Sequence, residues 1–194
     1  LAVNTTGATN TAIGSSALGA NTTAANNTAV GYIALGANTT GAGNTSLGAF
    51  ALDANTTGNT NTALGFGTLS ANTTATSNVA VGNNALLVNT TGDQNVAVGS
   101  GALDANTVGE YNTAIGEATL STDTKGSRNV AVGRAALANQ NFTSATNSYN
   151  IGVGYGAGNA ITTGIQNTFV GGLAGDATDD GSYNVCLLYT SPSP

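Results

Sequence analysis

The feature that most constrains the fold of this chain is a short motif that returns with a 17-residue period. The motif reads Asn-Thr/Val-Ala-Ile/Val/Leu-Gly, with small variations. Its first residue is Asn10, Asn27, Asn44, Asn61, Asn78, Asn95, Asn112, Asn129, Asn150, Asn167 and Asn184. Asn150 follows Asn129 after a longer, 21-residue step, which places an insertion within 139–149. Such a period predicts a stack of equivalent units in which each unit contacts its neighbours.

Two further positions keep the same phase. A leucine lies eight residues after each of the first eight motif asparagines: Leu18, Leu35, Leu52, Leu69, Leu86, Leu103, Leu120 and Leu137. A second asparagine recurs at Asn4, Asn21, Asn38, Asn55, Asn72, Asn89 and Asn106. The unit lacks the i, i+3, i+4, i+7 spacing of an amphipathic helix, and its Gly, Asn and Thr are poor helix formers.

We therefore predict two short strands in each unit. In the first strand, the Thr/Val and Ile/Val/Leu positions lie two residues apart and face the same side, which we expect to be the interior. The Ala between them then faces a closely approaching neighbour. The second predicted strand is Ala-Leu-x-Ala with its Leu inward, and the Gly-x-x and Asn-Thr-Thr-Gly segments are turns.

These assignments predict an all-β parallel β-solenoid or β-roll of 17-residue coils, stacked at about 4.8 Å. Glycines at the end of the first strand are expected at positive φ or close to another backbone. Leucines are expected to form an apolar ladder, and asparagines to form amide ladders. The expected ladder residues are Asn27, Gly31, Leu35, Asn38, Asn44, Gly48, Leu52, Asn55, Asn61, Gly65, Leu69 and Asn72.

Composition excludes several functions. The 194 residues include no His and one Cys, and only 6% of them are charged. The commonest general base and metal ligand is therefore missing, and we expect no enzyme, no catalytic or metal site and no cofactor. A net charge of −6 argues against nucleic acid as a partner. No apolar run is long enough to insert into a membrane.

The block from Asn27 to Gly41, repeated in phase, resembles the head repeats of trimeric autotransporter adhesins, the YadA-like head family. It is still more similar to the repeat regions of phage tail-fibre and bacterial surface proteins that end in an endosialidase-type chaperone. The adhesin repeat is typically shorter than this one. The resemblance implies a homotrimer of left-handed β-rolls on a bacterial surface or virion. It also implies a structural and adhesive role, as a rigid spacer or a head that binds a host-surface or matrix receptor.

An estimate of coil stability also favours self-association. One coil offers two large aliphatic side chains, each contributing about 1.5–3 kcal/mol when buried. Ordering a coil costs roughly 1.5 kcal/mol for each residue, and the backbone ladders offset part of that cost. A single narrow coil is therefore marginal, and packing several copies side by side would bury additional faces.

Two alternatives stay open. Regular Thr columns are typical of ice-binding solenoids, although the turn threonines here are adjacent rather than alternate. The Asn-Thr-Thr turns match the N-glycosylation acceptor pattern, which would make the chain a glycosylated extracellular fibril. These turns begin at Asn4, Asn21, Asn38, Asn55, Asn72 and Asn89, and Asn26, Asn44 and Asn141 match the same pattern.

The domain organisation follows the repeat. Residues 1–183 are predicted to be one repeat region, with variant coils in 150–183 where Gly158 and Gly175 replace the leucine. Residues 184–194 leave the pattern and are interpreted as an assembly artefact or a linker rich in Ser and Pro. Leu1 already occupies the leucine position, so we expect the chain to be a piece of a longer protein.

Overall fold

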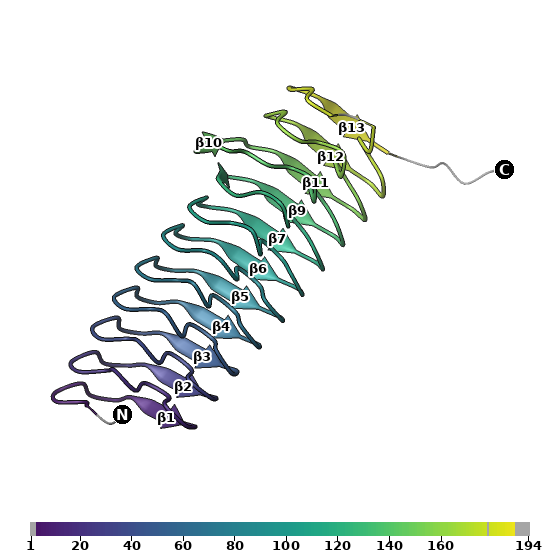
Figure 1. The fold of residues 1–194 in the computed structure, drawn as a ribbon. Helices are drawn as coiled ribbons and strands as arrows, with labels where there is room; N and C mark the ends of the chain where they lie inside the picture. The colour runs from purple at the N-terminus through teal and green to yellow at the C-terminus, as the bar shows by residue number, and fades with distance from the viewer. Residues whose placement is uncertain (1–2, 178, 189–194) are drawn as a thin grey trace.

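The computed structural model describes residues 3–177 and 179–188, so Leu1 and residues 189–194 lie outside the described part of the chain. The chain is an all-β solenoid that rises coil by coil from the N-terminus (Figure 1). Its strands are β1 Thr11–Ile13, β2 Thr28–Val30, β3 Thr45–Leu47, β4 Thr62–Leu64, β5 Val79–Val81, β6 Val96–Val98, β7 Thr113–Ile115, β8 Gly126–Ser127, β9 Val130–Val132, β10 Thr146–Asn147, β11 Ile151–Val153, β12 Thr168–Val170 and β13 Val185–Leu187. The predicted fold class is confirmed.

One long sheet runs the length of the solenoid. It has 11 parallel strands in the order β1-β2-β3-β4-β5-β6-β7-β9-β11-β12-β13. Equivalent residues pair, as Thr28 does with Thr45 and Ala80 with Ala97. Across the insertion, Val130 pairs with Ile151, so the register survives the longer step. The extra residues form β10, which pairs in parallel with β8 in a separate two-stranded sheet.

The interior of each coil is narrow, and this reverses one sequence prediction. The middle Ala of the strand points inward, as Ala63 and Ala80 do with no exposed surface, while the flanking Thr/Val and Ile/Val/Leu residues point outward. The inward Ala packs in one core with the buried leucines, such as Leu69. The interior between the strand and the segment that carries the leucine has room for one small side chain facing one large side chain. Ser46 fits the small position because its Oγ donates to the Ala51 carbonyl at 2.7 Å.

The predicted second strand was also wrong. The segment that carries the leucine is a turn, because each leucine has a left-handed backbone. The φ angle lies between 49° and 53° at Leu18, Leu35, Leu52, Leu69, Leu86, Leu103, Leu120 and Leu137. Bulky side chains rarely adopt this conformation, and here complete burial of the leucine offsets the backbone cost.

A glycine follows each strand at a sharp corner. From Gly14 to Gly171 these glycines have φ between 121° and 141°, a region that favours glycine. A Cβ on Gly48 would lie 2.3 Å from the carbonyl oxygen of Gly65 in the next coil. The corner therefore requires glycine both for its backbone angles and for the close approach of the next coil.

Two ladders of buried asparagine join the coils. In the first ladder, the amide Nδ2 of Asn38, Asn55 and Asn72 donates to the Asn Oδ1 of the preceding coil at 2.8–3.1 Å. In the second ladder, the Oδ1 of Asn27, Asn44 and Asn61 accepts the backbone N–H of the next motif asparagine at 2.9–3.0 Å.

The two ladders meet at shared carbonyl groups. The Gly58 carbonyl accepts hydrogen bonds from both Asn44 and Asn55. Side-chain amides thus replace solvent for the buried backbone of the turns.

In the variant coils, the large side chain of the interior moves from the leucine position to the strand position. Phe169 takes the inward Ala position of β12 and is fully buried. A Cβ on Gly158 or Gly175 would lie 2.5 Å or 2.2 Å from its ring, so glycine at the leucine position leaves space for the ring. Tyr155 and Leu173 are instead exposed. Strand β13 continues the sheet into the segment 184–194, with Cys186 paired to Phe169.

Candidate interaction surface

The outward side of the long sheet is an unbroken uncharged surface. We define the outer face as the first and third residues of its 11 strands. Each of these residues is Thr, Val, Ile or Leu. The exposed fraction is 61% for Ile13, 48% for Leu47 and 40% for Ile115. None of the described residues of the chain packs over this face to bury it, since all of its members are at least partly exposed.

The extent of the outer face indicates an interaction surface. Eleven strands at the usual spacing extend over about 50 Å. Monomeric proteins rarely expose contiguous apolar patches larger than a few hundred Å². Parallel sheets are also normally covered on both sides, whereas this chain covers only the inner one. A second molecule would therefore gain favourable burial by packing against the face.

An aromatic cluster extends this surface just beyond the corners of β2–β4. The rings of Tyr32 and Phe50 pack edge-to-face with centroids 5.4 Å apart, and those of Phe50 and Phe66 with centroids 5.8 Å apart. Tyr32 and Phe66 are about half exposed, at 51% and 54%. Rings held against one another in this way offer a large apolar contact area with little further loss of side-chain freedom.

None of the expected ladder residues contributes to the outer face. Asn27, Asn38 and Leu35 are buried inside the coil, and Gly31 forms its corner; the other expected ladder residues repeat these positions in later coils. Sequence reasoning missed the face because it turned the strand Ile and Val inward. One signal in the sequence could have revealed the outer face. The first strand position is Thr in some coils and Val in others, and an apolar interior would not accept a Thr hydroxyl that lacks a hydrogen-bond partner.

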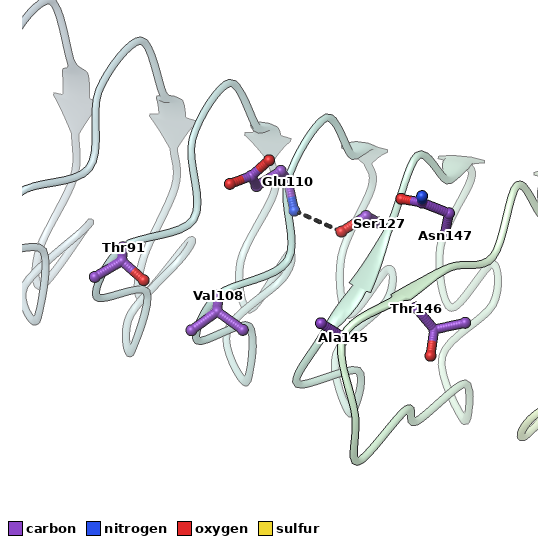
Figure 2. Close-up of a pocket in the computed structure, with 7 residues that line it drawn as sticks. All are labelled: Thr91, Val108, Glu110, Ser127, Ala145, Thr146 and Asn147. Carbon is purple, nitrogen blue, oxygen red and sulfur yellow. Dashed lines mark hydrogen bonds between the residues drawn. The ribbon is translucent and has the colours of Figure 1, made fainter.

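A groove lies on the other edge of the coils, where the insertion leaves the solenoid. Its volume is about 360 Å³. Thr91, Val108 and Glu110 line one side, and Ala145, Thr146 and Asn147 of the insertion line the other, with Ser127 between them (Figure 2). The Glu110 N–H donates to the Ser127 Oγ at 3.0 Å.

Two basic side chains, Lys125 and Arg128, belong to the coil beside this groove, and Arg134 follows the corner glycine Gly133 of the next coil. Lys125, Arg128 and Arg134 are all the basic residues of the sequence. The Arg128 guanidinium lies 4.6 Å from the centre of the Tyr111 ring and donates through Nε to the Asn147 Oδ1 at 3.1 Å. Arg134 forms an exposed ion pair with Glu117 at 3.1 Å, a contact of small energetic value.

The first asparagine ladder is interrupted at Asp123. This residue takes the asparagine position, is 1% exposed and accepts hydrogen bonds from Gly126 N and Phe142 N at 2.9 and 3.2 Å. A carboxylate has no proton to donate, and the buried Asn106 Oδ1 has no hydrogen-bond partner. Burial raises the pKa of the Asp123 carboxyl, although hydrogen bonds from Gln140, Phe142, Gly126 and Lys125 oppose the rise.

This break predicts a pH-dependent contribution to stability. The folded pKa of Asp123 lies above its ordinary value of 3.8, so the folded state holds the proton more tightly than the unfolded state. The contribution is greatest below pH 3.8 and is lost as the pH rises through the raised value. We expect the urea midpoint of the natural chain to rise, relative to that of Asp123→Asn, as the pH falls from about 7 to about 4.

The comparison of the two proteins isolates Asp123 from other carboxyls. Burial also raises the pKa of Asp104, while Thr162 and Thr163 lower that of exposed Asp180, and both are common to the two chains. If the urea midpoints of the two proteins changed with pH in parallel, the prediction would be contradicted.

No metal-binding group and no membrane-spanning helix stand out in the part of the chain that the structure describes. Within residues 3–177 and 179–188, no three His, Cys, Asp or Glu side chains gather closely enough to hold a metal ion, and no helix could cross a membrane. Comparison with protein-family models, with curated proteins and with solved structures found no match to this chain.

Proposed function

We propose that this chain is a rod segment of a homotrimeric surface adhesin or phage tail fibre, of the kind its repeats resemble. It acts as a rigid spacer or receptor-binding head outside the cell or on a virion. The partners are two further copies of the chain and a host-surface or matrix receptor. The role is structural and adhesive rather than enzymatic.

The observation that carries the proposal is the outer face. It is uncharged and in register over every coil of the long sheet, so copies of the chain can align along its whole length. Each strand has three residues or fewer, which makes the face a narrow strip. Three such strips around one axis bury one another while leaving the turn edges of the coils facing solvent.

The interior of the coil supports the same conclusion. The apolar core of each coil consists mainly of two Ala and one Leu, such as Ala80, Ala85 and Leu86. This is little apolar burial for a coil of this length, and buried apolar area is the main favourable contribution to folding. Burying the outer face between copies adds the aliphatic side chains that the coil itself leaves exposed.

A charge on the outer face is expected to separate the copies. We expect light scattering on the chain to give three times its mass, and Val81→Lys combined with Val98→Lys to give a monomer. Both valines lie on the outer face, where a lysine is tolerated by an isolated chain. In the trimer it would bring unpaired buried charges together, at a cost of several kcal/mol.

The matched control is Thr74→Lys, on an exposed turn away from the sheet, which should stay trimeric. A dimeric natural chain would contradict the trimer but keep the face as the interface. A folded monomer would contradict both.

A second candidate is ice binding, which one observation favours. Thr11, Thr28 and Thr45 pair in register and form an exposed column of threonines along the outer face. Thermal hysteresis in a solution of the chain would support ice binding. Freezing at the equilibrium freezing point would reject ice binding and leave the trimeric fibre as the proposed function. The two are alternatives because a trimer covers the same threonines.

Burial argues against a column of glycans at the Asn-Thr-Thr turns, whereas Asn26 and Asn141 of the other acceptor sites are exposed. Asn21, Asn38 and Asn55 have no exposed surface, and each donates its Nδ2 to a ladder hydrogen bond. A sugar on that nitrogen would replace an N–H bond and would not fit within the coil. The Asn-Thr-Thr segments are therefore explained by the amide ladder and the turn that follows it.

A further inference from the structure

We propose that the groove beside the insertion binds a neutral saccharide unit, and that it is the receptor-recognition site of the rod. This inference rests on the proposed adhesive function and gives it a location and a ligand class. The groove is bounded by the one coil, among those between Asn10 and Asn184, that departs from the 17-residue step.

The insertion is held in place and forms one wall of the groove. Strand β10 pairs with β8 so that Thr146 lies opposite Gly126 and Asn147 opposite Ser127. The Thr146 N–H donates to the Lys125 carbonyl at 3.3 Å, and the Ser148 N–H to the Ser127 carbonyl at 3.0 Å. Backbone hydrogen bonds therefore fix the wall before any ligand binds, which reduces the entropy cost of binding.

The groove offers the hydrogen-bonding groups that a sugar requires. Within the described residues, no ion pair or hydrogen bond occupies the Glu110 carboxylate, which is free to accept from two hydroxyl groups. The Ser127 Oγ accepts from Glu110 N, which leaves its own O–H available to donate. Arg128 holds the Asn147 Oδ1, so the amide Nδ2 of Asn147 is the end left to donate.

Apolar groups complete the lining. Val108 and Ala145 present methyl groups to the same space, where the C–H faces of a sugar ring can pack. The volume of about 360 Å³ is at the lower end of ordinary ligand sites, which suits one or two sugar rings. An anionic sugar is disfavoured by Glu110 and by the net charge of −6.

The position of the groove is compatible with a trimer. Strand β10 lies on the opposite edge of the coils from the long sheet (Figure 1). Packing of three outer faces would therefore leave the groove open to solvent. The same arrangement would present three copies at one height on the rod, which strengthens attachment to a surface that carries many identical sugars.

The test is saturation-transfer NMR of the full chain with neutral probes: glucose, galactose, mannose and N-acetylglucosamine, each also as a disaccharide. We expect at least one probe to bind, and Glu110→Gln to weaken its Kd by about tenfold or more. The matched control, Glu117→Gln, removes an exposed carboxylate outside the groove and should leave the Kd unchanged. Deletion of residues 143–146 restores the 17-residue step and should abolish binding.

Several results would overturn the inference. These are the absence of binding by any neutral probe, binding that Glu110→Gln does not weaken, and selective binding of sialic acid or of an extended peptide. Glu110→Gln decides the matter even where the deletion variant fails to fold. Light scattering on each variant separates the two proposals: saccharide binding by a monomer overturns the trimer alone, and a trimer that binds no saccharide overturns this site alone.

Discussion

The substitution Gly48→Ala is expected to lower the free energy of unfolding by about 3–6 kcal/mol, a large part of the stability of an ordinary domain. Gly48 has a φ of 141°, which disfavours any residue with a Cβ. The added methyl group would lie 2.3 Å from the Gly65 carbonyl oxygen and 2.6 Å from its carbon. Both atoms are backbone, so neighbouring coils must separate to relieve the contact.

Urea unfolding followed by circular dichroism measures this loss, and Gly43→Ala is its matched control. Gly43 also has a positive φ, of 70°, but the atom nearest to a Cβ there is the Thr60 Cγ2 at 3.4 Å, an ordinary van der Waals distance. Other coils place Asn26 or Ser77 at this position. We expect a change of about 1 kcal/mol or less at Gly43. Equal losses at the two glycines would show that the corner does not depend on close contact between coils.

The second large effect is expected at Asn61. Its Oδ1 accepts the Asn78 N–H at 3.0 Å, and its Nδ2 donates to the Ala75 carbonyl at 2.8 Å. Asn61→Ala leaves the Asn78 N–H without a partner in the interior and opens a cavity. The expected loss is about 2–4 kcal/mol, measured by the same urea titration.

An isosteric variant separates the hydrogen bonds of Asn61 from its volume. Asn61→Asp keeps the acceptor for Asn78 but places a carboxylate against the Ala75 carbonyl, so its stability should recover as the pH falls and the carboxyl is protonated. Asn83→Ala, on an exposed turn, is the control and should change stability by less than about 0.5 kcal/mol. Similar losses at Asn61 and Asn83 would contradict the role of the buried ladder.

Some features of the fold follow directly from the repeat. Gly31 and Asn44 are predictable because a corner at positive φ and a buried amide each admit few residue types. The constant length of the repeat likewise fixes the parallel register, since equal coils place like residues opposite one another.

Side-chain orientation was harder to predict. Ala29 lies inside and Val30 outside, which reverses the usual relation between hydrophobicity and burial. The width of the coil decides this, and that width depends on Leu35 entering the core from a left-handed turn. A sequence does not display this turn because leucine is an unusual residue at positive φ.

The groove also lies beyond what periodicity can predict. The insertion is visible as the one longer step between Asn129 and Asn150, but the repeat gives no template for its path. Only the pairing of β10 with β8 brings Asn147 beside Ser127 and across from Glu110. The interruption of the ladder at Asp123 was equally hard to predict. The sequence shows an acid at an asparagine position, but only the structure shows that the neighbouring Asn106 Oδ1 has no hydrogen-bond partner.

The shared register of the coils has a genetic consequence. Because the pattern of hydrogen bonds between coils recurs from one coil to the next, a gain or loss of 17 codons reproduces the same contacts in a rod of a new length. Recombination between the similar repeats supplies such changes. The longer step before Asn150 shows that extra codons at one corner leave the register intact. Rod length and displayed loops can therefore evolve independently of each other.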